Sequence, residues 1–399
     1  DILDLVHQHA EAFDYIHVST AINKLRKVAA LKPKESVALL NQDPRYALLL
    51  NLVRYHHKKF RGQAIANVMH GLAALEADMG VNPVDTQLAK QLMFVLEREA
   101  NDVGKQTTHG MNAQAVSNAL IAMSKSKPMY AAMPPSGWVA LASAAEKAAS
   151  NMNAQATANS LNALSKLKPA IGAMTTSGWG ALANAVKRSA PELESNHVSM
   201  TLNAIGKMEP AAAEMHKIHW AALAQATEGV TSQMNAQAVA MTLNALCRME
   251  HAASQMSPTG WHILAQQAEA VTLKMNALDV AMTLNAFAKM PEAADELSPA
   301  AWDVFAKAVH DTAFNMNGKG VAITINALAR LPPAAAAALS PYARERLENA
   351  ASREALHMTA QGREMTIFGC EKLEMKIPAV LRAGIRDGQE KSERPEART

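Results

Sequence analysis

The sequence predicts an all-α fold, a right-handed α-solenoid of about nine helix–turn–helix repeats with a period of 41 residues. The five tryptophans lie 41 residues apart, and no alternating strand pattern appears anywhere in the chain. A fixed period of about 20–50 residues is the sequence signature of stacked structural repeats. A 16-residue segment recurs at the same spacing, and its most regular copies start at Met111, Met152, Leu193, Met234, Met275 and Met316.

Each copy of the segment predicts one amphipathic helix, called helix A below. We number every copy from its first residue as offset 0. In Met234–Met249, MNAQAVAMTLNALCRM, offsets 5, 9 and 12 are Val239, Leu243 and Leu246. Spacings of four and three residues place these side chains on one face of a helix. Helix A is therefore expected to bury this stripe against the rest of its repeat.

Three regions are expected, with irregular N-terminal repeats over 1–110, regular repeats over 111–375 and a polar C-terminal tail over 376–399. Weaker copies of helix A start at Phe13 and Phe60, with longer spacings than in the regular region. A degenerate copy starts at Met358. The irregular region also contains a basic cluster, Arg54–Arg61 (RYHHKKFR), which fits either a phosphate contact or localisation signal, or a solvated helix end.

The tryptophans mark a second helix in each repeat, called helix B. The pairs Ser257-Pro258 and Ser298-Pro299 provide a capping hydroxyl followed by proline at the first helical position, and Thr175 occupies the corresponding capping place. An alanine-rich run follows each tryptophan, and small residues allow two helices to approach closely. We expect each indole to fill the space between helices A and B, although an exposed indole could instead stack on a nucleotide base.

Composition narrows the classes of function. The net charge of the 399-residue chain is only +3, so an electrostatic argument for nucleic acid must depend on where the charges lie. The two cysteines, Cys247 and Cys370, are predicted to be buried thiols in a reducing compartment. No apolar run reaches the roughly 20 residues that a membrane span requires, so membrane insertion is not expected.

No catalytic motif is present. The sequence lacks a glycine-rich phosphate loop, paired Cys-x-x-Cys ligands, a His-Glu-x-x-His zinc motif and a nucleophile elbow. His216 and His219 share a helix face but have no evident third ligand. We therefore expect a protein that is not an enzyme, with no catalytic residue, no metal, no cofactor and no small-molecule substrate.

The residues most suggestive of function are polar side chains that repeat on helix A. Offsets 3, 7, 10 and 14 fall within one narrow sector opposite the apolar stripe. Offset 10 is mostly asparagine, and offset 14 is basic in eight of the nine copies. Stacked repeats would align these positions as an asparagine row beside a basic row. The predicted binding residues are Gln155, Asn159, Asn162, Lys166, Asn203, Lys207, Asn244, Arg248, Asn285, Lys289, Asn326, Arg330 and Lys125.

Two explanations of these rows remain open. A polar face is ordinary for an amphipathic helix, and basic residues near a helix C-terminus compensate the helix dipole. Asparagine is a mediocre helix former, so its recurrence requires either a bond to the neighbouring repeat or a ligand. Single-stranded RNA would place phosphates on the basic row and base edges on the amides. An extended peptide would use the amides for its backbone groups.

Helix A resembles the first helix of octotricopeptide-type repeats, which accompany RAP domains in organellar RNA-processing proteins. The segments FRGQAIANVMHGLAAL at Phe60 and MNAQATANSLNALSKL at Met152 show this best. The array is also similar to the SKWP-repeat secreted effectors of plant-pathogenic bacteria, which are HEAT/armadillo-like. The first resemblance implies RNA binding. The second implies a bacterial protein that binds a host protein.

Single-stranded RNA is therefore the partner we expect first, held by a monomeric, non-enzymatic repeat module. The alternative is a secreted bacterial effector or scaffold that binds an extended or helical segment of a partner protein. The corresponding locations are the cytoplasm or, after secretion, a host cell.

Overall fold

The computed structural model describes residues 2–103 and 110–381, and this part of the chain contains helices but no strand. The predicted all-α solenoid is confirmed. It divides into two compact units, which are described separately below. The N-terminal unit comprises Asp1–Leu193 and Lys207–Ala222, and the C-terminal unit comprises Glu194–Gly206 and Leu223–Thr399.

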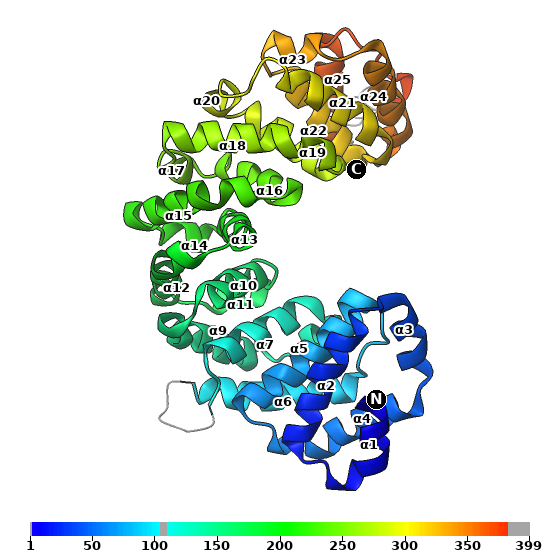
Figure 1. Ribbon diagram of the computed structural model, residues 1–399, viewed down its shortest axis with the longest axis vertical. Coiled ribbons are helices and arrows are strands. Elements are labelled where there is room, and N and C mark those ends of the chain that lie inside the picture. Colours follow the sequence, from blue (N-terminus) through cyan, green and yellow to red (C-terminus); the bar gives the residue numbers. More distant parts are fainter. Residues whose placement is uncertain (1, 104–109, 382–399) are drawn as a thin grey trace, which may run out of the picture. The chain divides into compact units, whose positions relative to one another are not determined.

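The A helices of each unit lie side by side in chain order (Figure 1). In the N-terminal unit they are α2 (Tyr15–Ala29), α5 (Gly62–Met79), α7 (Ala113–Lys125) and α10 (Ala154–Leu164). In the C-terminal unit they are α13 (Ser195–Ile205), α16 (Ala236–Leu246), α19 (Ala277–Phe287), α22 (Gly318–Leu328) and α25 (Ala360–Lys372).

The B helices form the second layer of each unit, for example where α9 packs on α7 and α18 packs on α16. Most of them end in a turn of 3-10 helix, and the first helix of the chain is α1 (Ile2–His9). The B helices are α4 (Pro44–His56), α6 (Thr86–Asn101), α9 (Pro135–Ala148), α12 (Thr176–Ser189), α15 (Lys217–Val230), α18 (Pro258–Val271), α21 (Ala301–Thr312) and α24 (Pro341–Glu354).

A third, short helix lies between A and B in most repeats, so the connection is more than the simple turn expected from the sequence. This helix packs on helix B of the preceding repeat, as α11 does on α9 and α20 does on α18. The helices in this position are α3 (Pro33–Gln42), α8 (Lys127–Ala132), α11 (Lys168–Ala173), α14 (Glu209–Ala213), α17 (Glu250–Ala253), α20 (Pro291–Ala294) and α23 (Pro333–Ala337).

The five tryptophans are buried, with 3–7% of each residue exposed, which confirms their predicted structural role. The apolar stripe of helix A is buried as well, and Val239, Leu243 and Leu246 are at most 2% exposed. Arg344 occupies the tryptophan position of the last repeat. Its Nη2 donates to the carbonyl of Ala336 at 2.8 Å, and its Nη1 donates to that of Leu373.

Most of the predicted helix B starts are correct. Thr175 Oγ1 accepts from the amide of Gly178, and Ser257 Oγ accepts from that of Gly260, both at 2.9 Å. At Ser298-Pro299 the predicted capping hydroxyl is also present, because Ser298 Oγ accepts from the amide of Ala301 at 3.2 Å, although α21 itself begins only at Ala301.

Glutamates eight residues after the tryptophan connect one B helix to the start of the next. Glu228 Oε1 accepts from the amide of Ser257 at 2.8 Å. Glu269 Oε1 accepts from the hydroxyl of Ser298 at 2.9 Å, and Glu146 Oε2 accepts from that of Thr175 at 3.0 Å. These bonds satisfy polar groups at helix starts and fix the register between neighbouring repeats.

The predicted polar tail over 376–399 is described only at its beginning. The amide of Lys376 donates to Glu348 Oε1 at 2.7 Å, and Leu381 is fully buried. The remainder of that prediction, 382–399, lies outside the described residues.

Candidate functional site

The predicted binding residues lie on the solvent side of the A helices. The side chains at offsets 3 and 14, such as Gln155 and Lys166, are exposed, and Lys125 is half-buried. Asn159 at offset 7 and four asparagines of offset 10 (Asn162, Asn203, Asn244 and Asn285) are half-buried. Asn326 is buried. We call this surface the A face and consider it within each unit.

In the part of the chain that the structure describes, the offset-10 asparagines of the regular repeats have no hydrogen-bond partner for their side chains. They are Asn162, Asn203, Asn244, Asn285 and Asn326. In the irregular region, Asn23 Oδ1 accepts from Arg26 Nη2 of the same helix at 3.3 Å. For Asn326 the lack of a partner is costly, because its Oδ1 atom is buried and accepts no hydrogen bond. A buried polar atom without a partner costs on the order of 1–3 kcal/mol. A bond from this row to the neighbouring repeat, which the sequence left open as the structural explanation, is therefore not formed.

The basic residues of offset 14 differ in their partners. Lys125 pairs with Asp78, at 2.6 Å from Nζ to Oδ2. No ion pair is formed by Lys166, Arg248, Lys289 or Arg330 among the residues described. The guanidinium of Arg330 lies 5.9 Å from the ring centre of Phe368, which is at offset 10 of the next repeat. In this pair of repeats, offset 14 therefore lies beside offset 10 of the next repeat.

Electrostatic effects show that basic residues of neighbouring repeats approach the same groups. Burial raises the pKa of the Cys247 thiol, while the charges of Lys289 and Arg248 act against that rise. In the N-terminal unit, His70 occupies offset 10. Burial, assisted by the nearby charges of Arg26 and Lys125, lowers its pKa to about 4. His70 is therefore neutral at physiological pH and presents a polar ring without adding charge.

A small pocket of about 200 Å³ brings two predicted residues together in the N-terminal unit. Lys125 and Lys166 line it, together with Lys127, Ser126 and Tyr130. The Tyr130 ring packs on Trp138, with ring centres 5.2 Å apart. Three lysines around one opening, of which only Lys125 forms an ion pair with another described residue, suit an anionic group such as a phosphate.

Offset 7 distinguishes the two units. In the N-terminal unit it carries Asn118 and Asn159. In the C-terminal unit the same position is apolar and half-buried in every repeat, so that a row of flexible side chains runs beside the asparagines. The residues of this methionine row are Met200, Met241, Met282, Ile323 and Met365.

The basic cluster Arg54–Arg61 is largely used by the fold. Arg54 pairs with Asp85, and Arg61 pairs with Glu99 at 3.3 Å. Glu99 is buried and also accepts the amide of Gly62 at 2.8 Å, at the start of α5. These contacts favour the structural interpretation of the cluster over a phosphate site.

His216 and His219 serve the start of α15. The amide of His216 donates to His219 Nδ1 at 3.0 Å, and His219 Nε2 lies 3.3 Å from Asn184 Oδ1. Both nitrogens of His219 therefore have protein partners. No group of three or more potential metal ligands occurs in residues 2–103 and 110–381.

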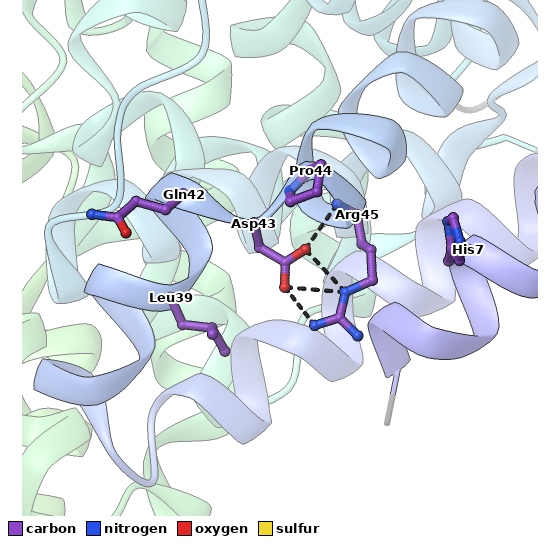
Figure 2. Close-up of a pocket in the computed structure, with 6 residues that line it drawn as sticks. All are labelled: His7, Leu39, Gln42, Asp43, Pro44 and Arg45. Atoms are coloured by element: carbon purple, nitrogen blue, oxygen red, sulfur yellow. Dashed lines mark hydrogen bonds and ion pairs between the residues drawn. The ribbon is translucent and has the colours of Figure 1, made fainter.

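A pocket of about 690 Å³ opens near the N-terminus between His7, Leu39 and Arg45 (Figure 2). Its one arginine is already neutralised. Arg45 binds Asp43 through Nε and Nη2, at 3.0 and 2.6 Å, and also pairs with Asp4. The contact with Arg45 lowers the pKa of Asp43. These ion pairs connect α4 to α1, and the positive charge of Arg45 is therefore not available to a ligand.

Sequence reasoning missed a second asparagine row, at offset 1. Asn235 Oδ1 accepts from the amide of Ala238 at 2.9 Å and caps α16. Asn112, Asn153, Asn276 and Asn317 act in the same way. The signal was the Met-Asn pair that opens most copies, because an asparagine before an apolar-periodic run is typical of a helix start.

We predict that two asparagines of α16 respond differently to alanine substitution. Asn235→Ala should lower the free energy of unfolding by about 1 kcal/mol, because a helix cap is lost. Asn244→Ala should change it by less than about 0.5 kcal/mol, because the Asn244 side chain has no hydrogen-bond partner among the described residues. Urea denaturation followed by circular dichroism measures both. Equal losses would show that offset 10 has a structural role.

The fold and the open polar rows define this chain as an α-helical repeat protein. No helix in the described part of the chain is long and apolar enough to cross a membrane. The comparison with family models gives no match, and neither does the comparison with curated proteins. Among solved structures, the crystal structure of the pentatricopeptide repeat protein PPR10 from maize is similar at 12% identity, with a TM-score of 0.16. That match covers 97% of this chain and 81% of the maize chain.

Proposed function

We propose that the chain is a non-enzymatic module that binds single-stranded RNA along the A face. The observation that carries this proposal is the row of asparagine amides in the regular repeats, Asn162 to Asn326. Among the described residues these amides have no protein partner, and the basic residues of offset 14 in the same repeats are mostly without an ion pair. Such amides can donate to and accept from base edges, while lysine and arginine hold phosphates. The resemblance of helix A to octotricopeptide-type repeats supports the same partner.

The roles differ by offset. Lys166, Arg248, Lys289 and Arg330 would contact phosphates, and the pocket between Lys125 and Lys166 would hold one phosphate group. The asparagines of offset 10, with Asn159 and Gln155, would contact bases or sugars. One repeat would then meet about one nucleotide, as in other helical-repeat readers of RNA.

A second candidate is a segment of a partner protein, as in a secreted bacterial effector or a scaffold. The methionine row at offset 7 favours it in the C-terminal unit, because methionine adapts to varied apolar side chains. An amphipathic partner segment could place its apolar side on that row and its polar groups on the asparagines.

The decisive experiment is selection of RNA from a randomised single-stranded pool by the purified chain. We expect a recovered motif that advances by about one base per repeat, with affinity that falls steeply as salt rises. Contacts with five phosphates predict a slope of log K against log[salt] of roughly −3.5. Affinity no higher than that of an unrelated protein of equal net charge would contradict the RNA proposal and leave the partner-protein alternative.

A further inference from the structure

Beyond the A face, we infer that a pocket on the B-helix side of the C-terminal unit binds a nucleotide unit, an aromatic base with its phosphate. The pocket has a volume of about 510 Å³ and lies between α21 and α24. None of its residues belongs to the predicted binding rows. Its lining includes His310, Phe314, Tyr342, Glu345, Arg346 and Asn349.

Two aromatic rings in this pocket are strongly exposed. Phe314 is 69% exposed and Tyr342 is 73% exposed, in a chain with only 4% aromatic residues. All five tryptophans of the same chain are buried. Exposed rings beside basic groups are the usual platform for bases, since each ring gains about 1–3 kcal/mol per stacked base.

The Phe314 ring is supported by an arginine that the fold holds in place. The guanidinium carbon of Arg353 lies 5.4 Å from the ring centre. Arg353 is itself fixed, because its Nη2 donates to the carbonyl of Met316 at 2.8 Å and its Nε contacts Glu354 at 2.9 Å. This ordered ring would lose little freedom when a base stacks on it.

Polar groups follow one face of α24. Tyr342, Arg346, Asn349 and Arg353 are spaced by three or four residues, which aligns them along the helix. Arg346 forms no ion pair with any described residue and is exposed, so it is available to a phosphate. The carboxylate of Glu345 can accept N–H groups of a base edge, and the amide of Asn349 can both donate and accept.

The base and phosphate that this pocket would bind could belong to a free nucleoside monophosphate or to one nucleotide of an RNA strand. Calorimetric titration with AMP, GMP, CMP and UMP tests the first source, and a short single-stranded RNA tests the second. Both titrations are repeated on a chain whose A-face row Lys166, Lys207, Arg248, Lys289 and Arg330 is changed to glutamate. If the charge-reversed chain still binds mononucleotides, the binding site is the pocket and not the A face. The pocket proposal and the A-face RNA proposal can therefore fail independently.

We expect saturable binding of at least one monophosphate. Tyr342→Ala and Phe314→Ala should each weaken it by about ten-fold, because a stacking surface is lost. Arg346→Gln should weaken the monophosphate but leave the corresponding nucleoside unchanged. Tyr55→Ala is the matched control, because Tyr55 is 77% exposed and lies in the other unit.

Thermal melting checks that each variant is folded. We expect the variants to fold, because both rings are highly exposed and contribute little to the core. Absence of saturable binding for all four monophosphates and for the RNA would overturn the inference. Equal affinity of the native chain and the Phe314→Ala, Tyr342→Ala double variant would also overturn it. RNA binding without mononucleotide binding, if lost on ring removal, would assign the pocket to a nucleotide of the strand.

Discussion

Reversing the charge of the basic row on the A face should reduce RNA binding by at least about 100-fold while the protein stays folded. The variant changes Lys166, Lys207, Arg248, Lys289 and Arg330 to glutamate. Four of the five changes remove a proposed phosphate contact, and all five add repulsion. Phosphate contacts supply much of the affinity of such complexes. Fluorescence anisotropy with the selected RNA, at low and physiological salt, measures the loss and the change in salt slope.

The matched control reverses five lysines on the B-helix side, which changes the net charge equally. They are Lys147, Lys187, Lys217, Lys274 and Lys307, all exposed. We expect this control to lose much less affinity, because it alters only the long-range field. Equal losses in both variants would show that net charge, not the A face, governs binding. Retained affinity in the A-face variant would refute the proposed phosphate contacts.

Replacement of a single tryptophan should have the largest effect on stability. Trp261→Ala is expected to lower the free energy of unfolding by about 3–5 kcal/mol, because a large side chain leaves a cavity between packed helices. Trp261 lies in the first turn of α18, and α18 packs on α16 of the same repeat and on α20 of the next. Chemical denaturation of both chains, followed by circular dichroism, measures the difference.

Leu273→Ala is the control for this substitution, because Leu273 is near the end of the same helix B but 58% exposed. It should change the free energy of unfolding by less than about 0.5 kcal/mol. If Trp261→Ala were equally mild but weakened RNA binding, the indole would serve the ligand and the structural role would be wrong. Loss of stability in Trp261→Ala alone supports the structural role.

The repeat architecture was readable from the sequence because its determinants are periodic. The 41-residue spacing of Trp138 through Trp302 and the stripe of Val239, Leu243 and Leu246 specify which faces are apolar, and both proved buried. The short helices between A and B were not readable. They have four to six residues in the regular repeats, as in Glu250–Ala253, and too few turns to show a helical period.

The candidate site was predictable only in part. Periodicity placed offsets 10 and 14 on the solvent side, but it could not show whether their side chains were already bonded within the protein. That answer required the positions of neighbouring repeats. The asparagines at offsets 1 and 10 look alike in sequence, yet Asn235 caps a helix, while the Asn244 side chain has no partner within residues 2–103 and 110–381.

The sequence by itself determined the helical class, the repeat period, the buried tryptophans and the face on which polar residues recur. This was possible because, in a helix, the sequence spacing of residues determines which side of the helix their side chains point to. Only the tertiary structure decided which charged residues form ion pairs with each other. It paired Arg54 with Asp85, Arg61 with Glu99 and Lys125 with Asp78, each across more than 30 residues of sequence. It also brought Phe314, from the 3-10 turn after α21, and Tyr342, from the start of α24, into one pocket. Such contacts depend on how repeats pack, and no local spacing encodes them.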